Sequence, residues 1–287
     1  MVPFLVAILA VGALCVAWGV IVERRWYRLM RYRLHILPAS GPDSLTILHL
    51  SDLHFVRGER RKARFLAGLP RPDLCVVTGD FLAEPDAIDT AVEAVGPVRG
   101  RLASWFVLGS NDYYVPMPLN YLRYFRKRRT PRRAARGPWR DLVAKLEADG
   151  WQDLTNVRRE VALDGLALEV AGLDDAHIAR HDLRVVPRSA PDRFGIAVMH
   201  SPDSAPETVA CGYELIVAGH THGGQVRLPG FGPLVTNSAM PRRLASGLIK
   251  IGDSWMSLSP GLGTSKYAPF RFLCRPEATL LELRPRC

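Results

Sequence analysis

The stretch VVTGDFLAEP, residues 76–85, ends an apolar, β-branched run with a glycine and one carboxylate, that of Asp80. Four other predicted strands in the chain end in a similar way, with Asp, Asn or His directly behind apolar residues. In α/β sheets, ligands collect at the carboxyl ends of strands, because the loops leave the core together there. We therefore expect these five strand ends to meet at one site.

The five strand ends supply a set of metal-ligand side chains. Residues two apart in an extended segment point to one side, so each D-x-H or H-x-H pair can hold one ion. A lone carboxylate such as Asp80 could bridge two ions through its two oxygens. Nitrogen and oxygen ligands without thiolate suit Mn, Fe, Zn, Co or Ni better than Ca, which predicts a site for divalent metal ions. The ends read LSDLHF (50–55), TGDF (78–81), LGSNDYY (108–114), VMHSPD (198–203) and AGHTHGG (218–224), and they supply Asp52, His54, Asp80, Asn111, Asp112, His200, His220 and His222.

The spacing of apolar runs, loops and helical patterns predicts an α/β fold with one or two sheets. Asp164-Gly165 predicts the turn of a hairpin. Helices are expected over 86–95 and 139–149. Strands are expected over 45–50, 73–79, 104–109, 159–165, 166–173, 194–200, 214–220, 255–260 and 278–284.

The ordered motifs resemble the calcineurin-like metallophosphoesterase superfamily over about residues 45–284, and most of all its membrane-associated bacterial branch of phosphodiesterases and lipid-A-pathway pyrophosphatases. The resemblance implies a four-layer α-β-β-α sandwich of two mixed sheets and two-metal hydrolysis of a phosphoric ester or pyrophosphate. It also implies the ligands. Asp52, His54, Asp80 and His222 would hold one divalent metal, and Asp80, Asn111, His200 and His220 would hold the second.

The third motif departs from the family pattern G-N-H-[DE], because this chain reads Gly109-Ser110-Asn111-Asp112. We interpret Asn111 as the ligand and Asp112 as the residue in the histidine's place, although an ungapped alignment would make Ser110 the ligand. The usual cationic helper is missing in either case. A water held by Asp112, or His177 in LDDAHIARHD (173–182), is the predicted replacement.

Other polar residues near the motifs receive structural interpretations. His49 lies inside an apolar run and is expected to be a core residue or to support the ligands. Asp174 and Asp175 are interpreted as turn residues. His181 could lie either beside the site or in a surface loop.

The first residues predict a membrane anchor. Val2–Val22 carry no charge, and a helix rising about 1.5 Å per residue would cross a hydrocarbon core of about 30 Å. An export signal is the alternative, but only Met1 precedes the run and the basic cluster follows it. The positive-inside rule then places the catalytic domain in the cytoplasm, behind a single-pass anchor in the cell membrane. We divide the chain into an anchor with its basic flank (1–33), a Pro- and Gly-containing linker (34–44) and a metallophosphoesterase domain (45–287).

The net charge of +10 comes largely from two short segments, so a uniformly basic nucleic-acid binder is not required. Five arginines follow the apolar run, and residues 120–140 contain nine Lys or Arg and no acid. The second segment predicts either a lid that meets anionic headgroups or a solvated basic loop. The five cysteines form no CxxC pair, which argues against a disulfide framework and against a zinc-cysteine site.

The sequence thus predicts a membrane-anchored, dinuclear-metal phosphoesterase that hydrolyses a phosphodiester or pyrophosphate bond, with a lipid headgroup as the expected substrate. Its partners would be this phosphate-containing substrate and the membrane, met through the N-terminal helix and the basic loop, with no stable nucleic-acid complex. The alternatives are a nuclease, a cyclic-nucleotide phosphodiesterase and a scaffold whose metal site has decayed.

Overall fold

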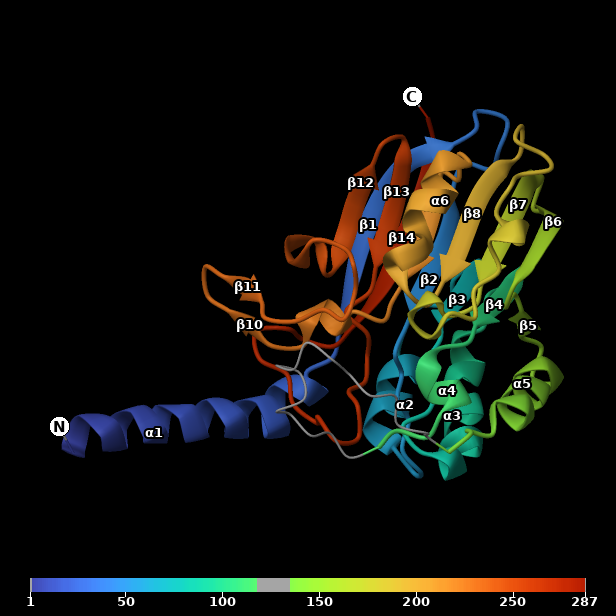
Figure 1. Cartoon of the computed structure of the whole chain (residues 1–287). Coiled ribbons are helices and arrows are strands. Elements are labelled where there is room, and N and C mark those ends of the chain that lie inside the picture. The colour runs from blue at the N-terminus through green and yellow to red at the C-terminus, as the bar shows by residue number, and fades with distance from the viewer. Residues whose placement is uncertain (1, 118–134, 287) are drawn as a thin grey trace.

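Two six-stranded mixed sheets form the body of the protein, in a computed structural model that describes residues 2–117 and 135–286 (Figure 1). The first sheet has the order β1-β14-β2-β3-β4-β5 and is parallel except between β14 and β2. Its strands are β1 (Arg28–Leu37), β2 (Leu45–Leu50), β3 (Leu74–Thr78), β4 (Ala103–Val107), β5 (Gln152–Asp153) and β14 (Glu277–Pro285).

The second sheet has the order β12-β13-β9-β8-β7-β6, with a parallel centre and an antiparallel strand at each edge. A separate hairpin pairs β10 (Arg227–Leu228) with β11 (Gly232–Pro233). The strands of the second sheet are β6 (Val157–Leu163), β7 (Leu166–Leu173), β8 (Phe194–Met199), β9 (Leu215–Ala218), β12 (Gly247–Ile251) and β13 (Ser254–Leu258).

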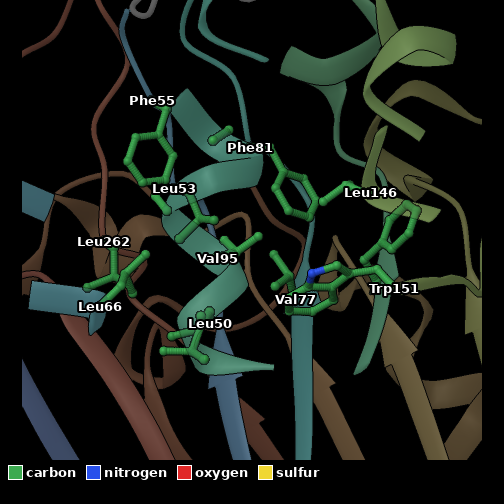
Figure 2. Close-up of a cluster of buried hydrophobic side chains, with 14 of the residues drawn as sticks. Leu50, Leu53, Phe55, Leu66, Val77, Phe81, Val95, Leu146, Trp151 and Leu262 are labelled. Atoms are coloured by element: carbon green, nitrogen blue, oxygen red, sulfur yellow. The ribbon is translucent and has the colours of Figure 1, made fainter. Parts of the chain in front are cut away.

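Three buried apolar clusters separate the layers. One lies between the sheets, where side chains of β2, β3 and β4 meet those of β7, β8 and β9. Another joins the first sheet to helices, with Phe81, Leu146 and Trp151 among its members (Figure 2). The third lies between the second sheet and α6. The helices are α2 (Arg60–Ala67), α3 (Ile88–Val95), α4 (Ser110–Tyr113), α5 (Trp139–Ala148) and α6 (Ala205–Ala210).

This arrangement of helices around two facing mixed sheets confirms the predicted α-β-β-α fold, and each of the nine predicted strands corresponds to an observed one. The predicted hairpin is also present. β6 and β7 are antiparallel, Leu163 pairs with Leu166, and Asp164 and Gly165 both have positive φ. The sequence interpretation missed the helices α2, α4 and α6, the strands β1 and β12 and the short strands β5, β10 and β11.

The predicted linker is wrong in its first part. Residues 34–37 belong to β1, which adds to the first sheet parallel to β14. Two arginines of the predicted basic flank form ion pairs along this edge, Arg28 with Glu277 at 2.7 Å and Arg33 with Glu282 at 3.0 Å. The predicted basic flank therefore includes a strand of the first sheet.

The N-terminal helix projects away from the sheets (Figure 1). Helix α1 (Val2–Ala17) continues through a π-helical turn (Trp18–Val22) and a 3-10 turn (Glu23–Arg25). These 24 residues are long and apolar enough to cross a membrane, and the apolar part is almost wholly exposed. Residues 120–134, the main part of the predicted basic lid, lie outside the described residues.

Candidate metal centre

The predicted ligands leave their strands in an unusual backbone conformation. Five of the eleven described non-glycine residues with positive φ are predicted ligands. Such conformations cost free energy for most side chains, although Asp, Asn and His tolerate them best. Their concentration here indicates that the fold holds these turns in place to aim the side chains. The five are Asp52, His54, Asp80, His220 and His222, with φ between 45° and 69°.

Four of these side chains form one cluster, in which the ligand atoms of Asp52, His54, Asp80 and His222 all lie within 4.8 Å of one another. The Nε2 atoms of His54 and His222 are 3.3 Å apart, and the two rings stack. Asp52 Oδ1 lies 3.4 Å from His222 Nε2. Two carboxylate oxygens and two imidazole nitrogens thus converge on one small space, which is the donor set of a divalent metal site.

A second cluster lies against the first and consists of Asp175, His200 and His220. His220 Nδ1 is 3.3 Å from His200 Nε2. Asp80 Oδ2 joins the two clusters, because it lies 3.5 Å from His54 Nε2 and 3.7 Å from His200 Nε2. One carboxylate therefore faces both groups of imidazoles.

Neighbouring carbonyl groups fix the tautomers of the second cluster. His200 Nδ1 lies 2.7 Å from the Thr78 carbonyl, and His220 Nε2 lies 3.2 Å from the Asn237 carbonyl. A carbonyl only accepts, so these nitrogens carry the protons. In the neutral form of each ring, the opposite nitrogens, His200 Nε2 and His220 Nδ1, carry the lone pairs and point toward the cluster, as in known metal sites.

Burial keeps three of the imidazoles neutral. It lowers the pKa of His54, and it lowers the pKa of His222 to about 4. Burial and the nearby His200 lower the pKa of His220 to about 4 as well. Metal binding requires unprotonated imidazole, so these side chains are already in the binding form near neutral pH.

The carboxylates are ionised for the opposite reason. Burial raises the pKa values of Asp52 and Asp80, but the surrounding histidines outweigh it and hold both below their usual value. Burial likewise lowers the pKa of His200, whereas Asp80, Asp175 and Asp52 raise it to about 10. The carboxylate charge therefore attracts positive charge into this space.

Unpartnered buried atoms support a fit to metal ions. Asp52 Oδ1 and Asp175 Oδ2 are buried and accept no hydrogen bond from any described residue. Buried oxygen atoms without a partner are costly, and a cation would satisfy them. Glycines also allow the ligand loops to approach closely, because a Cβ on Gly219 would lie 2.6 Å from Asp52 Oδ2 and one on Gly109 would lie 2.3 Å from Asp80 Oδ1. The residues present therefore fit a pair of divalent ions.

The third motif places Asn111 beside Asp80 and turns Asp112 away from the clusters. The Asn111 backbone donates to Asp80 Oδ1 at 2.8 Å, and its side-chain amide donates to Oδ2 at 2.5 Å. Asp112 is fully buried, and both its oxygens accept backbone N–H groups, from Gly109, Asp80, Phe81 and Leu82. The prediction of a water held by Asp112 is therefore at odds with its contacts, which give this carboxylate a positioning role.

His177 lies at the edge of the second cluster. It is exposed, and its ring centroid is 4.5 Å from that of His220. No contact of His181 with either cluster is present among the described residues. His177, the predicted replacement for the missing histidine, therefore lies beside the site.

Asp175 is the residue that the sequence interpretation missed. We interpreted it as a turn residue, and it does cap the turn of residues 176–178 by accepting the backbone N–H of His177 at 2.8 Å. Its carboxylate is also fully buried and belongs to the second cluster. Its position two residues beyond the end of β7 follows the same strand-end rule as the other ligands, and this was the available signal. Asp174 has a structural role, because it accepts hydrogen bonds from Tyr113 Oη at 2.9 Å and Arg180 Nε at 3.0 Å.

The prediction for His49 agrees with its contacts. His49 is fully buried and joins the sheets, with Nε2 3.0 Å from Thr78 Oγ1 in β3 and Nδ1 3.0 Å from Ser257 Oγ in β13. It supports the strands that carry the ligands and does not belong to either ligand cluster.

Two facing mixed sheets with paired Asp/His clusters at their strand ends define a metal-dependent phosphoesterase. The calcineurin-like phosphoesterase family matches residues 45–224, and the chain belongs to this family.

Relatives with similar sequences carry related names. The uncharacterized metallophosphoesterase YkuE of Bacillus subtilis is 28% identical over 256 residues, which span 85% of this chain and 80% of the relative. The phosphodiesterase YaeI of Escherichia coli is 26% identical over 270 residues, spanning 91% and 90%. A bovine transmembrane protein with metallophosphoesterase domain is 28% identical over 274 residues, which span 88% of this chain but 55% of that protein.

Proposed function

We propose that this phosphoesterase hydrolyses a phosphodiester or pyrophosphate bond in a lipid headgroup, with its catalytic domain held at the membrane surface. The observation that carries the dinuclear chemistry is the position of Asp80 Oδ2, within 3.5 Å of His54 Nε2 and 3.7 Å of His200 Nε2. A carboxylate between two imidazole clusters is what a bridging ligand requires.

The proposed ligands follow the two clusters. Asp52, His54, Asp80 and His222 would hold one ion, and Asp80, Asn111, His200 and His220 would hold the other, with Asp175 as an additional oxygen ligand. Asn111 suits this role because an amide that donates its N–H to Asp80 keeps its carbonyl oxygen available.

When bound, the two ions supply Lewis acidity toward phosphoryl oxygens and lower the pKa of a nucleophilic water. The protein's own residues supply geometry and proton transfer. Asp112 holds the turn of Asp80 by accepting its backbone N–H. The Thr78 carbonyl holds the ring of His200 by accepting the imidazole N–H. His177, exposed beside His220, is placed to give a proton to the leaving oxygen.

The membrane part of the proposal rests on α1 and its continuation to Arg25. An exposed apolar helix of this length is typical of an anchor, and the arginines that follow it favour the cytoplasmic side for the catalytic domain. The anchor would keep the site near headgroups, while its basic surroundings would favour anionic ones.

The test uses full-length protein in detergent micelles, loaded with Mn²⁺. We expect about two metal ions per chain by mass spectrometry and hydrolysis of bis(p-nitrophenyl) phosphate. Asp80→Asn should lose both metal ions and activity, whereas Asp192→Asn, an exposed control outside the site, should retain them. A wild-type protein that binds the metal but cleaves neither this diester nor any lipid or nucleotide phosphate would contradict the proposal and favour a scaffold. Cleavage of oligonucleotides in preference to lipids would favour a nuclease.

A further inference from the structure

A pocket of about 280 Å³ connects the metal centre to the base of the N-terminal helix. His54, a proposed metal ligand, lines its inner end. The other walls come from three segments far apart in sequence, namely the end of the apolar helix, the loop before α2 and residues 262–266. We call this space the cationic pocket, and the lining residues that carry the argument are Arg24, Arg25, Lys62 and Lys266.

The two lysines of the cationic pocket are already paired. Lys62 contacts Glu59 at 3.2 Å and donates to the Leu53 carbonyl at 2.5 Å. Lys266 pairs with Glu84 at 2.7 Å. These lysines hold the loops that form the walls, and their charge is largely compensated.

Arg24 and Arg25 differ from the other cations. Neither forms an ion pair with any residue that the structure describes, and Arg24 Nε is buried without a hydrogen-bond partner among them. An unsatisfied buried guanidinium nitrogen is costly unless a ligand accepts from it. Guanidinium groups suit phosphate and carboxylate oxygens, because their planar N–H groups can donate in pairs. The pocket therefore offers uncompensated cationic donors a short way from the metal centre.

The two arginines are held in place by the way the helix end packs on the catalytic domain. Gly19 accepts a hydrogen bond from the Arg271 backbone at 3.3 Å, and any side chain at Gly19 would clash with the Arg271 carbonyl. Glu23 is buried and accepts the Cys274 backbone N–H at 2.5 Å. The base of the helix is thus part of the pocket wall, so the pocket is formed before a ligand arrives.

We propose that the cationic pocket binds a second anionic group of the substrate, next to the phosphoryl group at the metal centre, and that this substrate is a membrane lipid. The inference rests on the proposed phosphoesterase function and adds to it a headgroup with two anionic groups. A lipid fits because the arginines directly follow the apolar segment, so the pocket opens at the depth of headgroups. Trp26 lies at the same level, with Arg275 stacked on it at 3.9 Å, which is typical of a membrane interface.

The test compares two lipids that differ by one phosphate. Full-length, Mn²⁺-loaded protein in nanodiscs is titrated by calorimetry with phosphatidylglycerol and with phosphatidylglycerol phosphate in neutral phosphatidylcholine vesicles. We expect the second lipid to bind at least about tenfold more tightly, because charge-assisted hydrogen bonds are stronger than hydrogen bonds between neutral groups. Arg24→Gln/Arg25→Gln should remove this preference, and Arg24→Lys/Arg25→Lys should retain part of it. The control Arg31→Gln/Arg243→Gln removes the same charge from exposed positions outside the pocket and should retain it fully.

Equal binding of the two lipids by wild-type protein, or an unchanged preference in a folded Arg24→Gln/Arg25→Gln protein, would overturn the inference. If that double variant unfolds, Arg25→Gln decides in the same way. The deacylated, water-soluble headgroups form a second arm, and binding as tight as that of the lipids would overturn the assignment to a lipid. Hydrolysis of the chromogenic diester is measured in parallel, so a failure of the phosphoesterase function is seen separately from a failure of this binding site.

Discussion

The Asp112 carboxylate accepts the backbone N–H of Asp80 at 2.9 Å, and through this contact a buried residue outside both clusters shapes the turn that carries the proposed bridging carboxylate. The N–H groups of Phe81 and Leu82 also donate to Asp112, at 2.8 and 3.2 Å. Asp80 has a φ of 56°, a conformation that the surrounding structure must enforce. Asp112 supplies this constraint.

Asp112→Asn should therefore destabilise the protein and weaken metal retention together. The amide would leave two of four buried N–H groups without an acceptor, at a cost of about 1–3 kcal/mol each. Thermal unfolding in detergent and metal content by mass spectrometry measure the two effects, with the exposed Asp141→Asn as control. A protein with wild-type stability and metal content but slow turnover would instead assign Asp112 to the chemistry.

The fold and the ligand clusters were accessible from sequence because both depend on local patterns. Apolar runs ended by Asp or His mark buried strands whose loops must meet at one edge, and this rule places Asp52, Asp80, His200 and His220 together. Glycine directly precedes Asp80 and His220, and close approach of the loops excludes a Cβ at Gly79 and Gly219.

The features that sequence did not reveal depend on long-range pairing. β1 contains several arginines, which disfavour a strand prediction from sequence alone. Its pairing with β14, about 250 positions away, places Glu277 beside Arg28 and Glu282 beside Arg33, and these ion pairs compensate the arginine charges. The orientation of Asp112 follows from backbone donors on another loop. Asp174 and Asp175 are adjacent and alike in sequence, and only the fold sends one to Tyr113 and the other to the second cluster.

This adjacent pair provides a matched test of the second cluster. Asp175→Asn should reduce metal content toward one ion per chain and lower turnover, because it removes a buried anionic ligand beside His200 and His220. Asp174→Asn should reduce stability, through weaker contacts with Tyr113 and Arg180, but retain the metal. Metal content and melting temperature of both variants separate the roles. Equal metal loss in the two would show that Asp175 acts only through the loop.

His177→Gln should slow hydrolysis according to the leaving group. An alkyl oxygen needs a proton as it departs, so turnover of an alkyl phosphodiester should fall about a hundredfold, whereas p-nitrophenolate leaves without one and its release should change little. His181→Gln is the control in the same loop. A uniform loss with both substrates would place His177 in binding or in metal positioning, since its ring lies 4.5 Å from that of His220.

His49 should make folding stability depend on pH. Burial lowers its pKa from 6.5 to about 3, despite the opposing effect of Asp52, so the imidazole stays neutral in the folded protein and takes a proton only on unfolding. The contribution of neutral, buried His49 to folding stability is thus fully present above its ordinary pKa. It is lost as the pH falls from that value toward 3. Between about pH 7 and about pH 5, wild type should lose about 2 kcal/mol more than His49→Gln. Urea unfolding measures this difference, and a chelator removes any contribution from bound metal. If the unfolding free energies of the two proteins fall equally between about pH 7 and pH 5, the predicted role of His49 is contradicted.

Glu23 should couple the anchor to the metal centre. Its buried carboxylate accepts the Cys274 backbone N–H at 2.5 Å and the Trp18 indole N–H at 3.1 Å, and Cys274 Sγ in turn donates to the carbonyl of His222 at 3.3 Å. Glu23→Ala would leave the buried Cys274 N–H unpaired, at about 1–3 kcal/mol, and would loosen the segment behind a proposed ligand. We expect a lower melting temperature and weaker metal binding, both measured in nanodiscs, while Glu93→Ala on the exposed face of α3 changes neither. If the melting temperature of Glu23→Ala falls while its metal affinity stays at the wild-type value, the end of the apolar segment stabilises the domain but is not coupled to the metal centre.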